Sequence, residues 1–248
     1  MYKDLAGKRI MITGGARGIG LATAQRFVDE GSRVVVLDID RKALSAVARK
    51  NRRIEGVVQA DVSDPAQVAR AFRETDGIFG GIDVLIANAG ISIRKDLVEI
   101  PDEQWARVLR TNLDGVFYCA REAVRQMKAR GSGVVLMTAS TNGTEGHPFY
   151  ADYNASKAGV ILLAKTMALE LAPAIRVNAV CPGYVLTEMQ KAEYTPEMLE
   201  AVNRKIPMKR HADPAEIAAL FAFLASSEAA YITGAEICID GGETAGLN

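Results

Sequence analysis

The chain has 248 residues, a length that a single α/β domain can fill around one core, so we expect one domain over residues 1–248. Thirty Lys and Arg side chains balance thirty Asp and Glu side chains without a long run of one sign. This balance argues against nucleic acid or a membrane surface as a partner. The sequence shows neither a signal-peptide pattern nor an apolar stretch of bilayer length, so a soluble, cytoplasmic protein is expected.

Seven short apolar runs rich in β-branched residues alternate with helix-length amphipathic stretches, which is the pattern of a parallel sheet built from βαβ units. Most runs are continuously apolar, as expected where helices cover both faces of a sheet. The expected strands are residues 9–13, 33–38, 56–61, 83–88, 133–138, 175–180 and 235–240. The expected helices are residues 19–30, 64–75, 102–130, 153–171 and 214–226. The pattern predicts the α/β class, as a single-domain, doubly wound, Rossmann-like parallel sheet.

Between the sixth and seventh strands lies a polar, mixed stretch, residues 187–213. It is long enough to fold over a site as a helical lid, and we expect it to cover the substrate. The three cysteines, Cys119, Cys181 and Cys238, are far apart in sequence and form no C-x-x-C pair. With only two histidines in the chain, we expect no metal site and interpret the cysteines as small, buried apolar side chains.

A glycine-rich turn, Thr13-Gly14-Gly15-Ala16-Arg17-Gly18-Ile19-Gly20, directly follows the first expected strand. Glycines let the backbone turn tightly and approach a pyrophosphate, whose charge the N-terminus of the next helix favours. Such a turn also serves purely structural purposes. Here it stands first in the chain, and Asp38 ends the second strand eighteen residues after Gly20. This context predicts a dinucleotide site.

Asp38 indicates NAD as the cofactor. A carboxylate there can accept hydrogen bonds from both ribose hydroxyls, whereas a 2′-phosphate would bring like charges together. Arg17 and Arg41 are two nearby positive charges that could soften this exclusion and allow NADP as well. For Arg17, the alternative is a solvated surface charge.

The segment from Thr13 to Gly20 resembles the T-G-x-x-x-G-x-G cofactor motif of the short-chain dehydrogenase/reductase family. Further matches follow in the family's order from about residue 8 to residue 242. The resemblance implies an active site of Asn112, Ser140, Tyr153 and Lys157. It also implies cofactor contacts from Gly14, Arg17, Gly18, Ile19, Gly20, Asp38, Asp61, Val62, Asn88, Gly90, Tyr153, Lys157, Gly183, Val185 and Thr187. Of these, Asp61 and Val62 would contact adenine, and the last three would lie beside the nicotinamide.

The residue types suit hydride transfer. A free tyrosine, with a pKa of about 10, is seldom ionised at neutral pH and needs help to act as a base. Tyr153 and Lys157 stand four apart on an expected helix and share a face, so the ammonium would favour the phenolate. Ser140 can hold the substrate oxygen. By the same resemblance, Lys157 binds the nicotinamide ribose, and Asn112 interrupts its helix to hold a water in a proton relay.

Each of these residues has a structural alternative when taken alone. Tyr153 and Lys157 could lie on the surface of an amphipathic helix, Asn112 could be an ordinary helix residue, and Ser140 could form a turn. Because all four residues occur together in the order of the family, catalytic roles are favoured over the structural alternatives.

The family acts on many alcohols and ketones, so only the residues near the expected active site can indicate the substrate. Asn142 and His147 lie between Ser140 and Tyr153, and Ser92 and Arg94 follow the Asn88–Gly90 turn. We expect Arg94, Ser140, Asn142, His147 and Tyr153 to contact a small, hydroxylated or anionic substrate, with Arg94 as a clamp for an acidic group. The alternative is that these loops are polar because they are exposed to solvent.

Three functions stay open. The first is an NAD-dependent dehydrogenase of a sugar, polyol or hydroxy acid. The second is a reductase of 3-oxoacyl thioesters or other ketones, and the third is a nucleotide-sensing regulatory protein on the same fold. A sensor has no need of a proton-transfer tyrosine, and Asp38 argues against a reductase fed by NADPH. The family resemblance also implies a homotetramer or dimer, for which the apolar stretch at residues 232–239 would suit a subunit interface.

Overall fold

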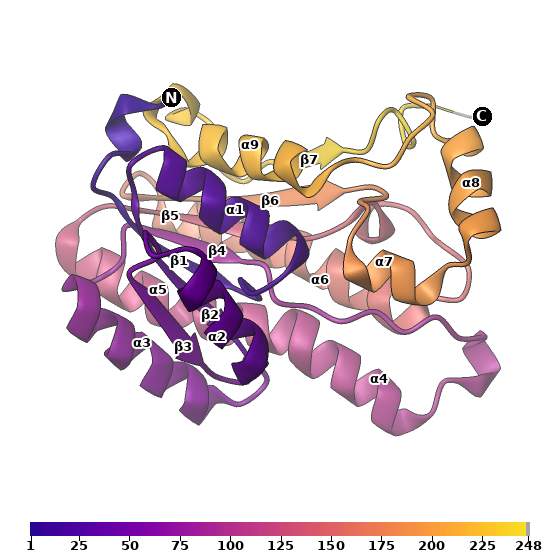
Figure 1. Cartoon of the computed structure of the whole chain (residues 1–248), viewed down its shortest axis with the longest axis horizontal. Coiled ribbons are helices and arrows are strands. Elements are labelled where there is room, and N and C mark those ends of the chain that lie inside the picture. The colour runs from indigo at the N-terminus through magenta and orange to yellow at the C-terminus, as the bar shows by residue number, and fades with distance from the viewer. Residues whose placement is uncertain (247–248) are drawn as a thin grey trace.

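The computed structural model describes residues 1–246, and residues 247–248 of the expected domain lie outside the described residues. Seven parallel strands form one sheet in the order β3-β2-β1-β4-β5-β6-β7 (Figure 1). The strands are β1 (Arg9–Thr13), β2 (Arg33–Asp38), β3 (Gly56–Gln59), β4 (Val84–Ala87), β5 (Gly133–Thr138), β6 (Ile175–Pro182) and β7 (Glu236–Ile239). The strand order changes direction between β1 and β4, which is where a doubly wound sheet opens a crevice for ligands.

Helices cover both faces of this sheet (Figure 1). The helices are α1 (Gly18–Asp29), α2 (Arg41–Lys50), α3 (Pro65–Phe79), α4 (Asp102–Leu109), α5 (Gly115–Arg130), α6 (Ala151–Leu171), α7 (Glu188–Glu193), α8 (Pro196–Lys205) and α9 (Pro214–Ala225). Apolar side chains of α1, α2 and α9 pack on one face, and those of α3, α5 and α6 pack on the other. Because successive strand residues point to opposite faces, Met11 enters one core while Ile10 and Ile12 enter the other.

The predicted fold class is confirmed, and each expected strand is present with its ends shifted by no more than a few residues. Two helical segments differ from expectation. No helix was expected at residues 41–50, where α2 forms. The expected helix 102–130 contains a π-helical turn, η3 (Arg110–Asp114), between α4 and α5. The stretch 187–213 contains two short helices, α7 and α8.

The interpretation of all three cysteines as buried side chains was wrong for Cys238. Cys119 and Cys181 are buried, whereas Cys238 is exposed. The reason is its position on β7, an edge strand along which Glu236 and Cys238 are exposed and the two isoleucines between and after them are half-buried. Among the described residues, no helix has the length and apolar character needed to cross a bilayer.

At the amino ends of the strands, Asp83 joins distant parts of the chain. Its carboxylate accepts hydrogen bonds from the Arg9 backbone (2.9 Å), from the Arg9 guanidinium (2.7 and 2.8 Å) and from Arg130 at the end of α5 (2.8 Å). Burial alone would raise the pKa of Asp83, but the hydrogen bonds from Arg9 and the charges of Arg9 and Arg130 outweigh it and hold the pKa below its usual value.

We therefore expect Asp83→Ala to lower the free energy of unfolding by about 2 kcal/mol, the scale of hydrogen bonds to a charged group. Because the folded-state pKa of Asp83 is lowered, this stabilisation is present above the unfolded-state pKa and is lost as pH falls through the folded-state value. Urea unfolding at neutral and acidic pH measures both effects. A cost that is equally large at the lowest accessible pH would contradict the electrostatic explanation.

Candidate functional site

The turns that follow β1 and β4 are bound to each other. Thr13 Oγ1 accepts the N–H groups of Asn88 (3.0 Å) and Ala89 (3.1 Å), and Asn88 Nδ2 donates to the carbonyl oxygens of Thr13 and Gly14 (both 3.2 Å). Gly14 has φ +63°, and a Cβ there would lie 2.8 Å from the Ala89 Cα atom. A side chain at this position would therefore be strained and would also push the two turns apart.

A cleft of about 640 Å³ runs along the carboxyl ends of these strands, a volume typical of a small-molecule site. Twelve of the residues predicted to contact the cofactor line it, namely Gly14, Arg17, Gly18, Ile19, Asp38, Asp61, Val62, Asn88, Gly90, Tyr153, Lys157 and Thr187. The other three lie elsewhere. Gly20 packs on the Gly14 carbonyl, Gly183 lines a second cavity, and Val185 is buried beside Ala212.

Asp38 lies in this cleft at the end of β2. Its Oδ2 accepts the N–H of Ala16 (3.1 Å), and its Oδ1 accepts the N–H of Asp40 (3.0 Å), so the glycine turn holds the carboxylate in place. Arg17, the positive charge closest to the turn in sequence, forms an ion pair with Asp40. Asp40 also caps α2 by accepting the N–H groups of Lys42 and Ala43. Of the two guanidinium groups that could attract a 2′-phosphate, Arg17 and Arg41, that of Arg17 is thus already partnered.

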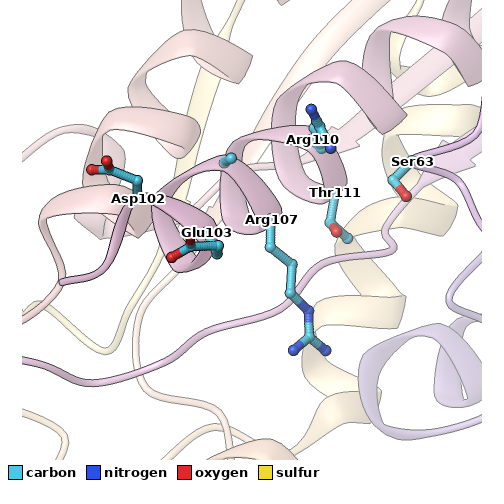
Figure 2. Close-up of a pocket in the computed structure, with 7 residues that line it drawn as sticks. Ser63, Asp102, Glu103, Arg107, Arg110 and Thr111 are labelled. Carbon is cyan, nitrogen blue, oxygen red and sulfur yellow. The ribbon is translucent and has the colours of Figure 1, made fainter.

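At its outer end the cleft meets a shallower pocket of about 450 Å³ along α4 and η3 (Figure 2). The two share Ser63, Arg107 and Thr111. Figure 2 shows the Arg107 side chain extending away from the helix backbone. Sequence analysis did not indicate this part of the wall, because α4 carries none of the motif residues.

The π-helical turn places Asn112. Its buried side chain accepts the Ile91 N–H (2.8 Å) and donates to the Ile91 carbonyl (2.9 Å) and to Ser156 Oγ (3.2 Å). The helix is interrupted where the resemblance implied it. A Cβ on Gly90 would lie 3.2 Å from Asn112 Oδ1 and 3.5 Å from Lys157 Nζ, so the bare glycine leaves space where these side chains meet.

Tyr153 and Lys157 project from α6 as expected, with Lys157 Nζ 5.5 Å from the centroid of the Tyr153 ring. Lys157 Nζ donates to the Thr138 carbonyl (2.7 Å). Ser140, at the end of β5, approaches Asn142 Oδ1 at 3.3 Å and the Pro182 carbonyl at 3.5 Å through its hydroxyl. These contacts are long, so the hydroxyl proton can turn toward another acceptor.

Burial dominates the ionisation of this pair. Loss of hydration raises the pKa of Tyr153 to about 12; a hydrogen bond with Ser140 opposes the rise and the Glu193 carboxylate adds to it. Burial also lowers the pKa of Lys157 to about 8. Sequence analysis expected the ammonium to favour the phenolate. In the structure, the largest influence on the phenol is its burial, which disfavours the phenolate.

A second cavity, of about 90 Å³, adjoins the cofactor cleft and shares Tyr153 and Met189 with it. Of the predicted substrate contacts, Ser140, Asn142, His147 and Tyr153 line it, and so does Ser92, which follows the Asn88–Gly90 turn. The sequence did not indicate seven further lining residues, which are Thr141, Tyr150, Tyr184, Met189, Gln190, Glu193 and Tyr194. Four of the seven lie within the stretch 187–213, so the segment was indicated but the individual side chains were not.

Arg94 is not brought to this cavity. Its guanidinium lies over the Phe149 ring, 3.9 Å from the centroid, and the side chain is exposed. Stacking on an aromatic face satisfies the guanidinium without an anion. Within residues 1–246, no group of three or more His, Cys, Asp and Glu side chains is placed to hold a metal ion.

Comparisons with known proteins agree with this arrangement. A family model described as enoyl-(acyl carrier protein) reductase matches residues 14–244. An NADP-dependent (R)-specific alcohol dehydrogenase of Lentilactobacillus kefiri is 37% identical over 253 residues, which cover 99% of this chain and 100% of that enzyme. The chain belongs to the short-chain dehydrogenase/reductase family.

Solved structures of the family extend the comparison. A gluconate 5-dehydrogenase of Burkholderia cenocepacia in complex with NADP and tartrate is 32% identical, with a TM-score of 0.92 over 98% of this chain and 97% of that one. A 3-ketoacyl-(acyl-carrier-protein) reductase of Brucella melitensis complexed with NADH is 33% identical, with a TM-score of 0.91 over 97% and 99%. This short-chain dehydrogenase/reductase is therefore an oxidoreductase of hydroxyl or carbonyl groups that uses a nicotinamide cofactor. Its relatives differ in substrate and in the cofactor they bind.

Proposed function

We propose that the protein is an NAD-dependent dehydrogenase of a small polar alcohol: a sugar, a polyol or a hydroxy acid. The observation that carries this proposal is the substrate-side cavity, which is small, opens beside Tyr153 and is lined largely by hydroxyl, amide, imidazole and carboxylate groups. A site that hydrogen-bonds substrate hydroxyls rejects analogues without them, because its own polar groups would be left unpaired.

Asn112, Ser140, Tyr153 and Lys157 are the proposed catalytic residues. A bound nicotinamide would accept a hydride from the carbinol carbon, or donate one to a carbonyl carbon. Ser140 and Tyr153 would hold the substrate oxygen between them, and the Tyr153 phenolate would take its proton during oxidation. Lys157 supplies a positive charge that favours the phenolate, and Asn112 holds the backbone at Ile91 beside it.

Tyr153→Phe should lower kcat by about a hundred-fold or more while leaving NAD affinity nearly unchanged, because the ring remains and only the transferable proton is lost. Initial rates of NAD reduction and fluorescence titration with NADH measure the two quantities. Tyr2→Phe, on the N-terminal segment away from both cavities, is the matched control. Turnover like the wild type in a folded Tyr153→Phe protein would refute the role.

NAD is the proposed cofactor because Asp38 faces the cleft and Arg17 is paired with Asp40. The Lentilactobacillus relative is named for NADP, so a direct test is needed. Asp38→Asn should raise the ratio of kcat/KM with NADP to kcat/KM with NAD by roughly ten-fold, since it removes the charge that repels a 2′-phosphate.

Asp40→Asn supplies the second arm of this test. Asparagine also caps helices, so α2 is kept while the ion pair with Arg17 is lost. The freed guanidinium should lower KM for NADP without raising KM for NAD. A native enzyme that already prefers NADP, or an unchanged preference in both variants, would show that these residues do not set cofactor choice.

The second candidate function is reduction of a 3-oxoacyl thioester or another ketone, which the similarity to the Brucella reductase favours. A substrate panel separates the two: long-chain thioesters or steroids that outperform every sugar, polyol and hydroxy acid would put the reductase first. A cytoplasmic location stays a prediction.

We also propose a homo-oligomer, a tetramer or dimer. Leu162 and Leu169 are 66% and 86% exposed, and their seven-residue spacing puts them on one face of α6. A second copy of the chain would bury this apolar stripe. The double variant Leu162→Asp, Leu169→Asp should therefore elute as a smaller species in size-exclusion chromatography with light scattering. A monomeric wild type, or an unchanged oligomer in the variant, would contradict the assignment.

A further inference from the structure

Three residues that line the substrate-side cavity each carry a buried polar atom without a hydrogen-bond partner within residues 1–246. The three atoms are His147 Nε2, Gln190 Nε2 and Glu193 Oε1. An unsatisfied buried polar atom costs free energy, so native proteins rarely keep one unless another group supplies the bond. His147 comes from the segment between β5 and α6, and the other two come from α7. The residues that carry these atoms thus line the same small cavity from two walls.

The Glu193 carboxylate is fixed on one side. Tyr150 Oη donates to Glu193 Oε2 (3.0 Å) and lies 3.2 Å from the Tyr194 hydroxyl. Because a hydroxyl has one proton, Tyr150 donates to Glu193 while it accepts from Tyr194. This chain of bonds holds the carboxylate in place and leaves Oε1 free to accept a further hydrogen bond.

The charge in the cavity is negative. Within the described part of the chain, the residues that line the cavity include no Lys or Arg. Burial lowers the pKa of His147, so its imidazole is neutral at neutral pH and does not offset Glu193. The Glu193 carboxylate contributes to the raised pKa of Tyr153, which puts its charge within electrostatic reach of the phenol. Arg94, the one cation that sequence analysis assigned to this cavity, stacks on Phe149 instead.

We propose that Glu193 and Gln190 recognise a hydroxyl group of a neutral polyol and that Glu193 excludes hydroxy acids. A hydroxyl can donate to Glu193 Oε1 and accept from Gln190 Nε2 at the same time. A carboxylate can only accept, and beside Glu193 it would meet a like charge. The inference rests on the proposed dehydrogenase function of the same site and narrows its substrate from polar alcohols in general to neutral polyols.

Two matched pairs of compounds test the selectivity. Propane-1,2-diol differs from lactate, and sorbitol from gluconate, by a primary alcohol in place of a carboxylate. Binding is followed by saturation-transfer NMR on the protein with and without NADH, with which an alcohol cannot react. The diol and sorbitol should bind at least ten-fold more tightly than the matched acids. An acid that binds as well as its alcohol in both pairs would overturn the inference.

Glu193→Gln tests the residue. It keeps the side-chain shape and an oxygen that can accept from Tyr150, but it removes the charge. The preference for alcohol over acid should shrink by roughly ten-fold, mainly through tighter binding of the acids. Glu200→Gln, the same change on exposed α8, is the control and should keep the wild-type preference. Equal weakening of all four compounds by Glu193→Gln would indicate a structural role and refute the assignment.

The pH profile gives an independent readout where a polyol is turned over. The ionisable groups around Tyr153 are Lys157 on the cofactor side and, in the cavity, Glu193, His147, Tyr150, Tyr184 and Tyr194. Oxidation needs the phenolate, so its rate rises with pH through the pKa of Tyr153. Because Glu193 raises that pKa, Glu193→Gln should move the rising limb of kcat to lower pH, and an unmoved limb would contradict the placement of its charge.

Binding and turnover separate the two proposals. Alcohols that bind more tightly than acids, but are never oxidised with NAD or NADP, would support the recognition by Glu193 and refute the dehydrogenase function. Oxidation of lactate or gluconate in preference to the alcohols would support the dehydrogenase function and refute the recognition.

Discussion

The hydrogen bonds that Thr13 makes with the turn after β4 hold together the edge of the sheet on which the site is built. From them a polar chain crosses the carboxyl ends of the strands. Asn88 Oδ1 accepts the Thr138 hydroxyl at the end of β5 (3.2 Å), and the Thr138 carbonyl accepts Lys157 Nζ from α6 (2.7 Å). Each member is largely buried, so a missing partner would leave an unsatisfied group. One hydrogen-bond network therefore positions both the cleft and the pair formed by Tyr153 and Lys157.

This dependence explains why Gly14 and Gly90 matter to the site. Both stand where two segments converge, and a methyl group on either would press against the Ala89 backbone or the Asn112 carboxamide. The backbone itself forms the wall of the cleft at these points. In the proposed NAD site, selectivity for the flat, charged parts of a dinucleotide would come from main-chain shape, and selectivity for its ribose would come from the Asp38 side chain.

The pattern of apolar residues was sufficient to predict the sheet, because short, continuously apolar runs such as that of β2 are typical of buried parallel strands. It was insufficient for α2, whose ten residues bury only Leu44 and Val47 on a strongly basic helix. The N-cap at Asp40 was the available signal. The residues of the cofactor cleft were predictable because they follow strands in a fixed order, so topology alone brings them to one edge.

The substrate side could not be predicted in the same way. Glu193 and Tyr150 are separated by 43 residues in sequence and meet only because α7 folds back across the end of α6. No local pattern encodes such a contact, and the hydrophilic character of residues 187–213 predicted a lid without indicating which side chains face inward. Arg94 illustrates the converse: it stands beside a motif, yet an adjacent aromatic ring holds it outside the cavity.

Thr187 connects the two sides of the site. Its side chain lines the cofactor cleft, and its hydroxyl accepts the Gln190 N–H (3.3 Å) at the start of α7. The same helix of under two turns carries Gln190 and Glu193 into the substrate cavity. If a bound nucleotide displaced Thr187, α7 would carry the movement to the two residues that are proposed to contact the alcohol. Thermodynamic linkage makes such coupling reciprocal. If the bound nucleotide raises the affinity of the protein for the alcohol by some factor, the bound alcohol raises its affinity for the nucleotide by the same factor.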